Sequence, residues 1–238
     1  VRGSRAVPPD EVLAIANRKR HSTSIEVQQA TTLEALRELY HSGVPGLGCL
    51  NFASAKNAGG GFLNGSLAQE ESLACNSALY PCQLACREYY DANRASENAL
   101  YTDWMIWSPM VPFIRLDDGT HSEQPYLAHV ITAPAPNAGA VAGRIPDAPE
   151  RVLTTLKRRA ARVCQLAAQQ GVQTFVLGAW GCGVFRNDPA QVARVFTELL
   201  QTGGEYEGVF ERVVFAIHDP LDGTPVYQAF KNTLSPNP

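Results

Sequence analysis

Several features of common protein classes are missing from this sequence of 238 residues. No apolar run approaches the length of about 20 residues that a membrane-spanning helix needs, and no signal peptide is recognisable. The formal net charge is −3, which argues against a broad basic surface for nucleic acid. No cysteine–histidine pair has the spacing of a zinc site. We therefore expect a cytoplasmic protein with no membrane segment, no DNA partner, no metal and no cofactor.

The six cysteines do not form an obvious framework, because they are scattered at positions 49, 75, 82, 86, 164 and 182. A chain of this size does not depend on disulfides, so we expect free buried thiols in a reducing compartment. Three of them, Cys75, Cys82 and Cys86, fall seven and four residues apart in a stretch expected to be helical. That spacing predicts one shared helix face.

Internal repeats, low-complexity tracts and linkers are also missing, so residues 1–238 are expected to form one domain, with about 1–45 as an N-terminal extension. Apolar patterns of helical and strand period alternate along the chain. We expect strands at 24–28, 48–54, 104–107, 111–116, 126–132, 174–178 and 212–218. Helices are expected at 8–18, 32–40, 66–79, from the break at Pro81 to about 90, 149–170, 188–200 and 224–232. This alternation predicts an α/β fold with a largely parallel or mixed sheet covered on both faces.

A basic run lies within the expected long helix at Lys157, Arg158 and Arg159. Such a run can contact nucleic acid. Val152 and Leu156 supply an apolar inner face to the same helix, so we interpret the basic run as its solvated outer face.

The stretch from 51 to 71 joins a buried strand to a helix through a run of glycines: Gly59, Gly60 and Gly61. Backbone N–H groups at such a junction favour anions, phosphate above all. Three polar residues follow on the helix: Gln69, Glu70 and Glu71. A plainer interpretation is a flexible turn before a helix whose acidic residues complement its dipole.

A second glycine-containing loop follows the strand at 174–178 and comprises Gly181, Cys182, Gly183, Val184 and Phe185. It offers successive N–H groups with little bulk, which suits a diphosphate. Both glycine loops are expected to face one another at the carboxyl ends of the strands. A nucleophilic Cys182 is a competing interpretation. Its base would have to be His218 or His129, and neither has a sequence-defined relation to it.

The glycine triplet followed, after seven residues, by Gln-Glu-Glu resembles the signature of bacterial-type poly(ADP-ribose) glycohydrolases. Residues 178–188 are similar to the diphosphate-binding loop of that family, and the resemblance covers about 48–219. It implies a macrodomain-like, three-layer α/β/α fold with a central mixed sheet and an N-terminal helical extension. It also implies binding of ADP-ribose, action on poly(ADP-ribose) and poly-ADP-ribosylated proteins, and a monomer.

The same resemblance implies residue roles in cleavage of ribose–ribose O-glycosidic bonds. Glu71 would protonate the departing ribose oxygen and then activate water, which requires a raised pKa. Glu70 would hold hydroxyl groups of the adjoining ribose, and Gln69 would orient the site. Phe185 would position a ribose, with core packing as its alternative. Asn57 would bond a ribose hydroxyl, or is present because asparagine tolerates turn geometry.

Consecutive helical residues project about 100° apart, so the two glutamates cannot flank one bond as opposed carboxylates. One of them must therefore serve as both acid and base. Two other functions stay open. One is a reader that binds ADP-ribose without cleaving it, although an anionic ligand gains nothing from adjacent carboxylates. The other is a hydrolase of mono-ADP-ribosylated protein. Whether cleavage is terminal or internal, and where adenine binds, also stay open.

Overall fold

The computed structural model of the chain describes residues 1–14 and 21–234. In this part of the chain, seven strands form one mixed sheet. The strands are β1 (Arg5–Val7), β2 (Ser24–Gln28), β3 (Leu47–Phe52), β4 (Met105–Arg115), β5 (His121–Ala133), β6 (Thr174–Leu177) and β7 (Arg212–Ala216). Their order across the sheet is β1-β4-β5-β3-β6-β7-β2. Five neighbouring strands run parallel to one another: β5, β3, β6, β7 and β2. By contrast, β4 is antiparallel to both of its neighbours, β1 and β5.

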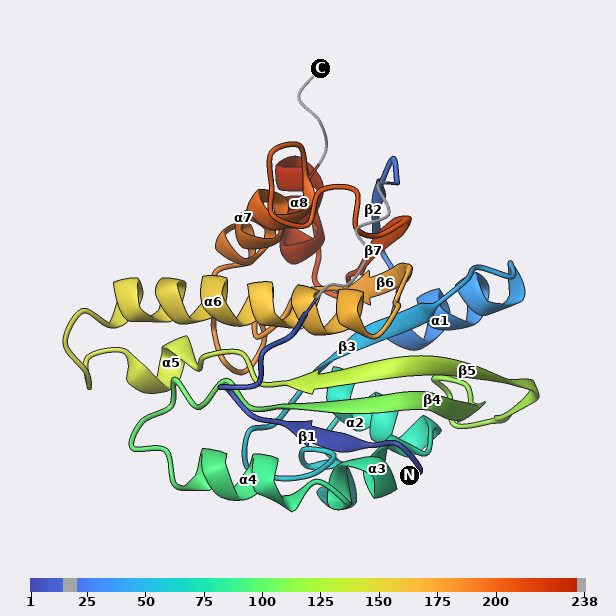
Figure 1. Cartoon of the computed structure of the whole chain (residues 1–238), viewed down its shortest axis with the longest axis horizontal. Helices are drawn as coiled ribbons and strands as arrows, with labels where there is room; N and C mark the ends of the chain where they lie inside the picture. Colours follow the sequence, from blue (N-terminus) through green and yellow to red (C-terminus); the bar gives the residue numbers. More distant parts are fainter. Residues whose placement is uncertain (15–20, 235–238) are drawn as a thin grey trace.

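Helices cover both faces of this sheet (Figure 1). They are α1 (Thr32–His41), α2 (Gln69–Asn76), α3 (Leu79–Leu84), α4 (Arg87–Arg94), α5 (Ala138–Val141), α6 (Ala148–Gln169), α7 (Pro189–Leu200) and α8 (Pro225–Leu234), with a short 3₁₀ helix at Phe62–Asn64. One apolar core packs α6, α7 and α8 on the sheet, and others pack α1 to α4 on the opposite face. The predicted three-layer α/β/α fold is confirmed.

The alternation of side chains along β4 shows how the two cores are separated. Met105 and Trp107 belong to the core under α6, whereas Ile106 between them packs with Tyr89 and Tyr90 of α4. Successive residues of a strand point to opposite faces of the sheet. The run of apolar residues in β4 therefore supplies both layers at once.

The topology also fixes where a ligand can enter. β3 pairs in parallel with β5 on one side and with β6 on the other. The carboxyl ends of these strands meet at one edge of the sheet, where the chain leaves β3 toward α2 on one face and leaves β6 toward α7 on the other. Ligand sites of open α/β sheets lie at such a point.

The helix predicted at 8–18 is wrong over 8–14, which follow β1 as irregular chain. Residues 15–18 of that prediction lie outside the described part. Side chains of α6 take the carbonyl groups that a helix would have used. Arg162 Nη2 donates to Pro8 O at 2.9 Å, and Gln165 Nε2 donates to Leu13 O at 2.6 Å. These bonds hold the segment against α6.

The helix predicted at 66–79 is shorter than expected and breaks before the predicted position. It begins at Gln69 and ends at Asn76, and Ser77 is extended and bridges to Phe113 of β4. Pro81 lies within the first turn of α3, where its missing N–H costs no hydrogen bond.

This break separates the three cysteines that were predicted to share a helix face. Cys75 lies on α2 and is exposed, whereas Cys82 lies on α3 and Cys86 follows it, both buried. All six cysteines are free. The two strands predicted at 104–107 and 111–116 are one strand, β4, with an irregular register between Ser108 and Val111.

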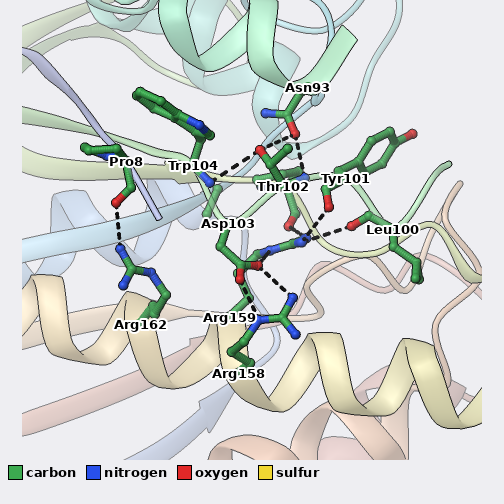
Figure 2. Close-up of polar contacts among 12 residues, drawn as sticks. Pro8, Asn93, Leu100, Tyr101, Thr102, Asp103, Trp104, Arg158, Arg159 and Arg162 are labelled. Atoms are coloured by element: carbon green, nitrogen blue, oxygen red, sulfur yellow. Dashed lines mark hydrogen bonds and ion pairs between the residues drawn. The ribbon is translucent and has the colours of Figure 1, made fainter. Parts of the chain in front are cut away.

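The predicted solvated face of α6 is wrong at Arg159, whose side chain is 0 % exposed, while Arg158 beside it is 52 % exposed. Figure 2 shows both guanidinium groups at the carboxylate of Asp103. Arg159 Nε donates to Asp103 Oδ1 at 3.0 Å. Although burial alone would raise it, the hydrogen bond from Arg158 and the charge of Arg159 hold the pKa of Asp103 below its usual value.

Arg159 also binds backbone carbonyl groups of two loops. Its two terminal nitrogens donate to the carbonyl oxygens of Pro134, at 2.7 Å, and Leu100, at 2.9 Å. A longer bond of 3.4 Å reaches the carbonyl of Tyr101. The guanidinium thereby joins α6 to the loop after α4, which Figure 2 shows, and to the loop after β5.

We expect Arg159→Met to lower the free energy of unfolding by about 3 to 5 kcal/mol, the cost typical of breaking a buried ion pair by removing one partner. Chemical denaturation measures this change. Arg158→Met is the matched control, because it removes an exposed partner of the same carboxylate and should cost less than about 1 kcal/mol. Equal losses in the two variants would contradict the role assigned to Arg159.

Candidate functional site

A cavity of about 920 Å³ opens where the strands β3, β6 and β7 end. Its walls come from the segment after β3, the start of α2, the loop after β6 and the end of β7. Residues that line it include Phe52, Asn57, Gln69, Glu70, Glu71, Tyr101, Gly181, Cys182, Gly183, Val184, Phe185, Ile217 and His218. The predicted acids and the predicted diphosphate loop therefore border one cavity.

The loop after β6 presents unoccupied backbone donors to this cavity. Among the described residues, no protein acceptor meets the N–H groups of Gly181, Gly183, Val184 or Phe185. Gly181 has a φ of +74°, and a Cβ there would lie 2.3 Å from Asn187 Nδ2. Adjacent free N–H groups in a turn form a concave site for an anion. The arrangement suits a diphosphate.

Two side chains anchor this loop to the end of β5. Trp180 Nε1 donates to Ala133 O at 3.1 Å, and Asn187 Nδ2 donates to Pro136 O at 2.9 Å. Both acceptors lie at or just after the end of β5. The proline-rich segment at 133–139 thus supports the loop, as well as connecting two elements.

Phe185 and Tyr101 form an aromatic pair at the cavity, with ring centroids 5.9 Å apart. Tyr101 has a φ of +61°, which is unusual for a residue with a side chain. Such a conformation costs about 1 to 3 kcal/mol and persists where surrounding contacts enforce it. The carbonyl bonds from Arg159 to Tyr101 and the preceding Leu100 are such contacts.

The glycine run at 59–61 uses its N–H groups within the protein. Gly61 N donates to Glu71 Oε1 at 2.9 Å, and Gly59 N donates to the side chain of Gln83 at 3.0 Å. Gly60 N donates to Asn57 O at 3.1 Å. Gly60 has a φ of +61°, and a Cβ there would lie 2.3 Å from Glu71 Oε1. The run is glycine because the backbone must pass directly against the two acids.

Glu70 is 3 % exposed and receives three hydrogen bonds from the protein. Gln83 Nε2 and Asn51 Nδ2 donate to its Oε1 at 2.8 and 3.2 Å, and Ser54 N donates to its Oε2 at 2.6 Å. Burial raises the pKa of Glu70 to about 8, against the lowering effect of these donors. The corresponding expectation for Glu71 stays a prediction.

Gln69 fixes the first turn of α2 against β3. Its Oε1 accepts from Phe52 N at 2.8 Å, and its Nε2 donates to Leu50 O at 2.8 Å and to Thr32 Oγ1 at 3.2 Å. The amide of Gln69 thus takes the place of a strand partner at the end of β3. Because Glu70 and Glu71 follow directly, this contact sets the position of both acids.

Glu71 lies on the border between two cavities. The second cavity, of about 800 Å³, shares Ser54, Asn57 and Glu71 with the first. Gly60 and Gly61 line the second cavity, whereas Gly181 and its loop line the first. The expectation that the two glycine loops face one another across one cavity is therefore wrong, because the glycine run turns its amides toward Glu71 and Gln83.

The position of Cys182 does not favour a nucleophile. Burial raises the pKa of its thiol to about 12, and the nearby charge of Asp188 adds to this effect. The thiolate is the reactive form of cysteine, so the environment opposes that chemistry. His129 lies on β5, where its ring stacks on Trp107 at 4.9 Å, and His218 lines the cavity.

Several residues of the site carried no signal in the sequence, chiefly Gln83 and Tyr101. Tyr101 lines the first cavity, whereas Gln83 lies behind it and holds Glu70 and Gly59. Both lie outside the glycine motifs and gain these positions only through the packing of α3 and of the loop before β4. Within residues 1–14 and 21–234 there is no cluster of three or more side chains able to hold a metal. In the same ranges, no helix combines the length and apolar character needed to cross a membrane.

Comparison with known proteins gives consistent matches. Residues 1–116 match the family model of the microbial-type PARG catalytic domain. The structure is similar to poly(ADP-ribose) glycohydrolase (PARG) from Thermomonospora curvata, with a TM-score of 0.93 and 42% identity over 98% of this chain and 86% of that one. No curated protein gives a significant match.

Two similar structures were solved with bound molecules. The Deinococcus radiodurans PARG in complex with ADP-ribose has a TM-score of 0.91 and 47% identity over 98% of this chain and 94% of that one. The Thermomonospora curvata enzyme bound to the inhibitor ADP-HPD has a TM-score of 0.91 and 43% identity, covering 98% of this chain and 85% of that one.

The raised pKa of Glu70 predicts a stability that falls as pH rises. The unfolded carboxyl loses its proton near its ordinary pKa of about 4.5, whereas the folded one retains it up to about 8. The folded state therefore binds more protons in this window, and rising pH favours unfolding. Between pH 4.5 and 8, we expect the free energy of unfolding of wild type to fall by at least about 1 kcal/mol more than that of Glu70→Gln.

Chemical denaturation of both proteins at a series of pH values from 4.5 to 8 measures this difference. Glu70→Gln also loses an acceptor for Ser54 N, which lowers its stability at every pH, so only the slope is compared. Glu88→Gln, at an exposed position on α4, is the control and should follow wild type. If the plots of unfolding free energy against pH ran parallel for wild type and Glu70→Gln, the buried carboxyl would already be ionised at low pH, which would contradict the prediction.

Proposed function

Because the chain belongs to the bacterial poly(ADP-ribose) glycohydrolases, we propose that Glu71 is the general acid and base of its reaction. The enzyme hydrolyses ribose–ribose O-glycosidic bonds of poly(ADP-ribose) and releases ADP-ribose. The observation that carries the assignment is the position of Glu71 on the border of both cavities. The polymer extends to both sides of the bond that is cut, so we expect the group that cuts it to lie where two binding cavities meet.

The terminal ADP-ribose unit occupies the larger cavity in this proposal. Its diphosphate accepts hydrogen bonds from the free N–H groups of the loop that contains Gly183. Its ribose next to the scissile bond rests on the ring of Phe185, which Tyr101 supports from the side. Asn57, which borders both cavities, is placed to bond a ribose hydroxyl. Backbone donors bind the anion without requiring a broad basic surface, in keeping with the net charge of −3.

The first step breaks the glycosidic bond. Gly61 N holds Oε1 of Glu71, so Oε2 is available to donate a proton to the departing ribose oxygen. The electron pair of the bond goes to that oxygen, and positive charge develops at the anomeric carbon. The bound diphosphate lies close enough in the same cavity to stabilise this charge.

The second step consumes water. The ionised Glu71 accepts a proton from a water molecule as the water oxygen bonds to the anomeric carbon. ADP-ribose leaves with a free hydroxyl group, and Glu71 regains the proton that it gave up. One carboxyl therefore suffices, and no opposed second acid is needed.

Glu70 positions the sugar in this mechanism. The carboxyl group of Glu70 has about four positions for hydrogen bonds, and three of them are used by protein donors. Its Oε2 accepts from Ser54 N alone, so this oxygen has room for one ribose hydroxyl. Because Glu70 is held by three separate segments, the sugar that binds it is held in a fixed orientation.

The setting of the reaction is part of the same proposal. The enzyme acts as a monomer on polymer attached to poly-ADP-ribosylated proteins, without DNA, in the cytoplasm. Six free cysteines are in keeping with a reducing compartment.

Glu71→Gln tests the central assignment. The substitution keeps the size of the side chain and its bond from Gly61 but removes the exchangeable proton. We expect release of ADP-ribose from polymer to fall by a factor of at least about a hundred to ten thousand. Affinity for ADP-ribose, measured by calorimetry, should change by less than about tenfold. Full activity in this variant would refute the role of Glu71.

The assay also distinguishes the two glutamates and the substrate class. Glu70→Gln should lose activity through misplacement of the sugar, with weaker binding of ADP-ribose than in Glu71→Gln. Mono-ADP-ribosylated protein serves as a second substrate for wild type. Faster release from that substrate than from polymer would move the proposal to mono-ADP-ribose hydrolysis.

Gly183→Val tests the diphosphate site. A Cβ at Gly183 would meet no protein atom within 4 Å, so the fold should survive. The added side chain lies at the free N–H groups and should keep a diphosphate away from them. We expect ADP-ribose affinity to fall by at least about tenfold, the loss of one or more charge-assisted hydrogen bonds. Calorimetry on a folded variant with unchanged affinity would refute the site. Ala142→Val, at an exposed turn position that lines neither cavity, is the control.

A further inference from the structure

The terminal ADP-ribose unit occupies the first cavity in the proposed function, which leaves the second cavity without an assigned ligand. It lies between the glycine run and the helices α3 and α4, on the other side of Glu71. At about 800 Å³ it is nearly as large as the first, at about 920 Å³. A cavity of this size has room for a ligand of similar dimensions.

Two arginines of α4, Arg87 and Arg94, supply positive charge to this cavity. They are seven residues apart, which places them on one side of the helix about 10 Å from each other along its axis. Arg94 is paired with Asp91 at 3.0 Å. In the described ranges, Arg87 is exposed and forms no ion pair. A guanidinium with no partner at a cavity wall is available to a phosphate.

Aromatic side chains stand beside this charge. Tyr80 and Tyr90 both line the cavity. Tyr90 is only 4% exposed, and its hydroxyl is buried with no hydrogen-bond partner among the described residues. A buried polar group without a partner is uncommon in a folded protein. A ligand hydroxyl or base nitrogen in the cavity would supply the missing partner.

We propose that this cavity binds the next ADP-ribose unit of the polymer, the one that carries the departing ribose oxygen. The inference rests on the proposed function, because the two units are joined at the bond that Glu71 protonates. With the terminal unit in the first cavity, the adjoining unit must extend across Glu71 into the second. Arg87 binds its diphosphate, and Tyr80 and Tyr90 contact its adenosine. An enzyme with a net charge of −3 needs such local cations to hold a polyanion.

Arg87→Ala tests the proposal through two substrates that differ on the departing side. Poly(ADP-ribose) places an ADP-ribose unit in the second cavity, whereas an α-nitrophenyl glycoside of ADP-ribose has a departing group too small to reach Arg87. We expect kcat/KM for polymer to fall about tenfold, as for the loss of one charge-assisted hydrogen bond. Turnover of the nitrophenyl substrate and affinity for ADP-ribose should stay within about twofold. Arg87→Lys should retain part of the polymer activity, because it keeps the charge but not the paired donors.

Arg151→Ala is the matched control, because Arg151 is exposed on α6, on the opposite face of the sheet. It should leave both activities unchanged. Equal losses on the two substrates in Arg87→Ala would overturn the proposal, since Arg87 would then act on the chemistry. Unchanged kcat/KM for polymer would overturn it as well.

A binding experiment separates this inference from the catalytic role of Glu71. In Glu71→Gln, an ADP-ribose dimer should bind about tenfold more tightly than ADP-ribose, and adding Arg87→Ala should remove that advantage. The comparison measures binding alone, on a dimer that is checked to be intact at the end of the measurement. Equal affinities for dimer and monomer in Glu71→Gln would overturn the second site and leave the proposed reaction untouched.

Discussion

Glu70 receives its three hydrogen bonds from β3, from the turn that follows it and from α3. Removing a carboxyl group from water is costly unless its oxygens find donors, so this contact draws three separate segments to one point. Gln83 extends the arrangement, because it donates to Glu70 and accepts from Gly59. Gly61 then binds the other acid, Glu71. The orientation of the proposed proton donor therefore depends on the neutral or charged state of its neighbour and on the packing of α3.

The opposite wall of the first cavity depends on a second buried ionic group. Arg159 binds Asp103 and carbonyl groups of both adjoining loops. One of these loops carries Tyr101, which supports Phe185. The other includes carbonyl oxygens, of Ala133 and Pro136, that accept from Trp180 and Asn187, the anchors of the proposed diphosphate loop. A guanidinium in the middle of a helix, far from solvent, thus connects the two loops that enclose the proposed ligand.

The sequence allowed the α/β class, most elements and the two motifs to be predicted, because these depend on local patterns. Apolar alternation identified β3, β6 and β7, and the glycine run marked the entry to α2. The failures involve contacts between distant segments. Arg159 looks solvated within its helix, and only the approach of Asp103 explains its burial. Residues 8–14 have helical spacing, but α6 takes their carbonyl groups. Gln83 is an ordinary polar residue until α3 packs beside α2.

The arrangement of the sheet has a consequence for synthesis of the chain. Both edge strands, β1 and β2, come from its N-terminal part, yet β1 pairs with β4 and β2 with β7. The ion pair between Glu26 and Arg212 joins residues 186 positions apart. On the ribosome, β2 therefore has no partner until nearly all of the chain has emerged, and one edge of the sheet stays open. Long-range parallel pairing of this kind folds slowly and exposes strand edges meanwhile. The charged side chain of Glu26 on β2 disfavours pairing of this edge strand with another chain.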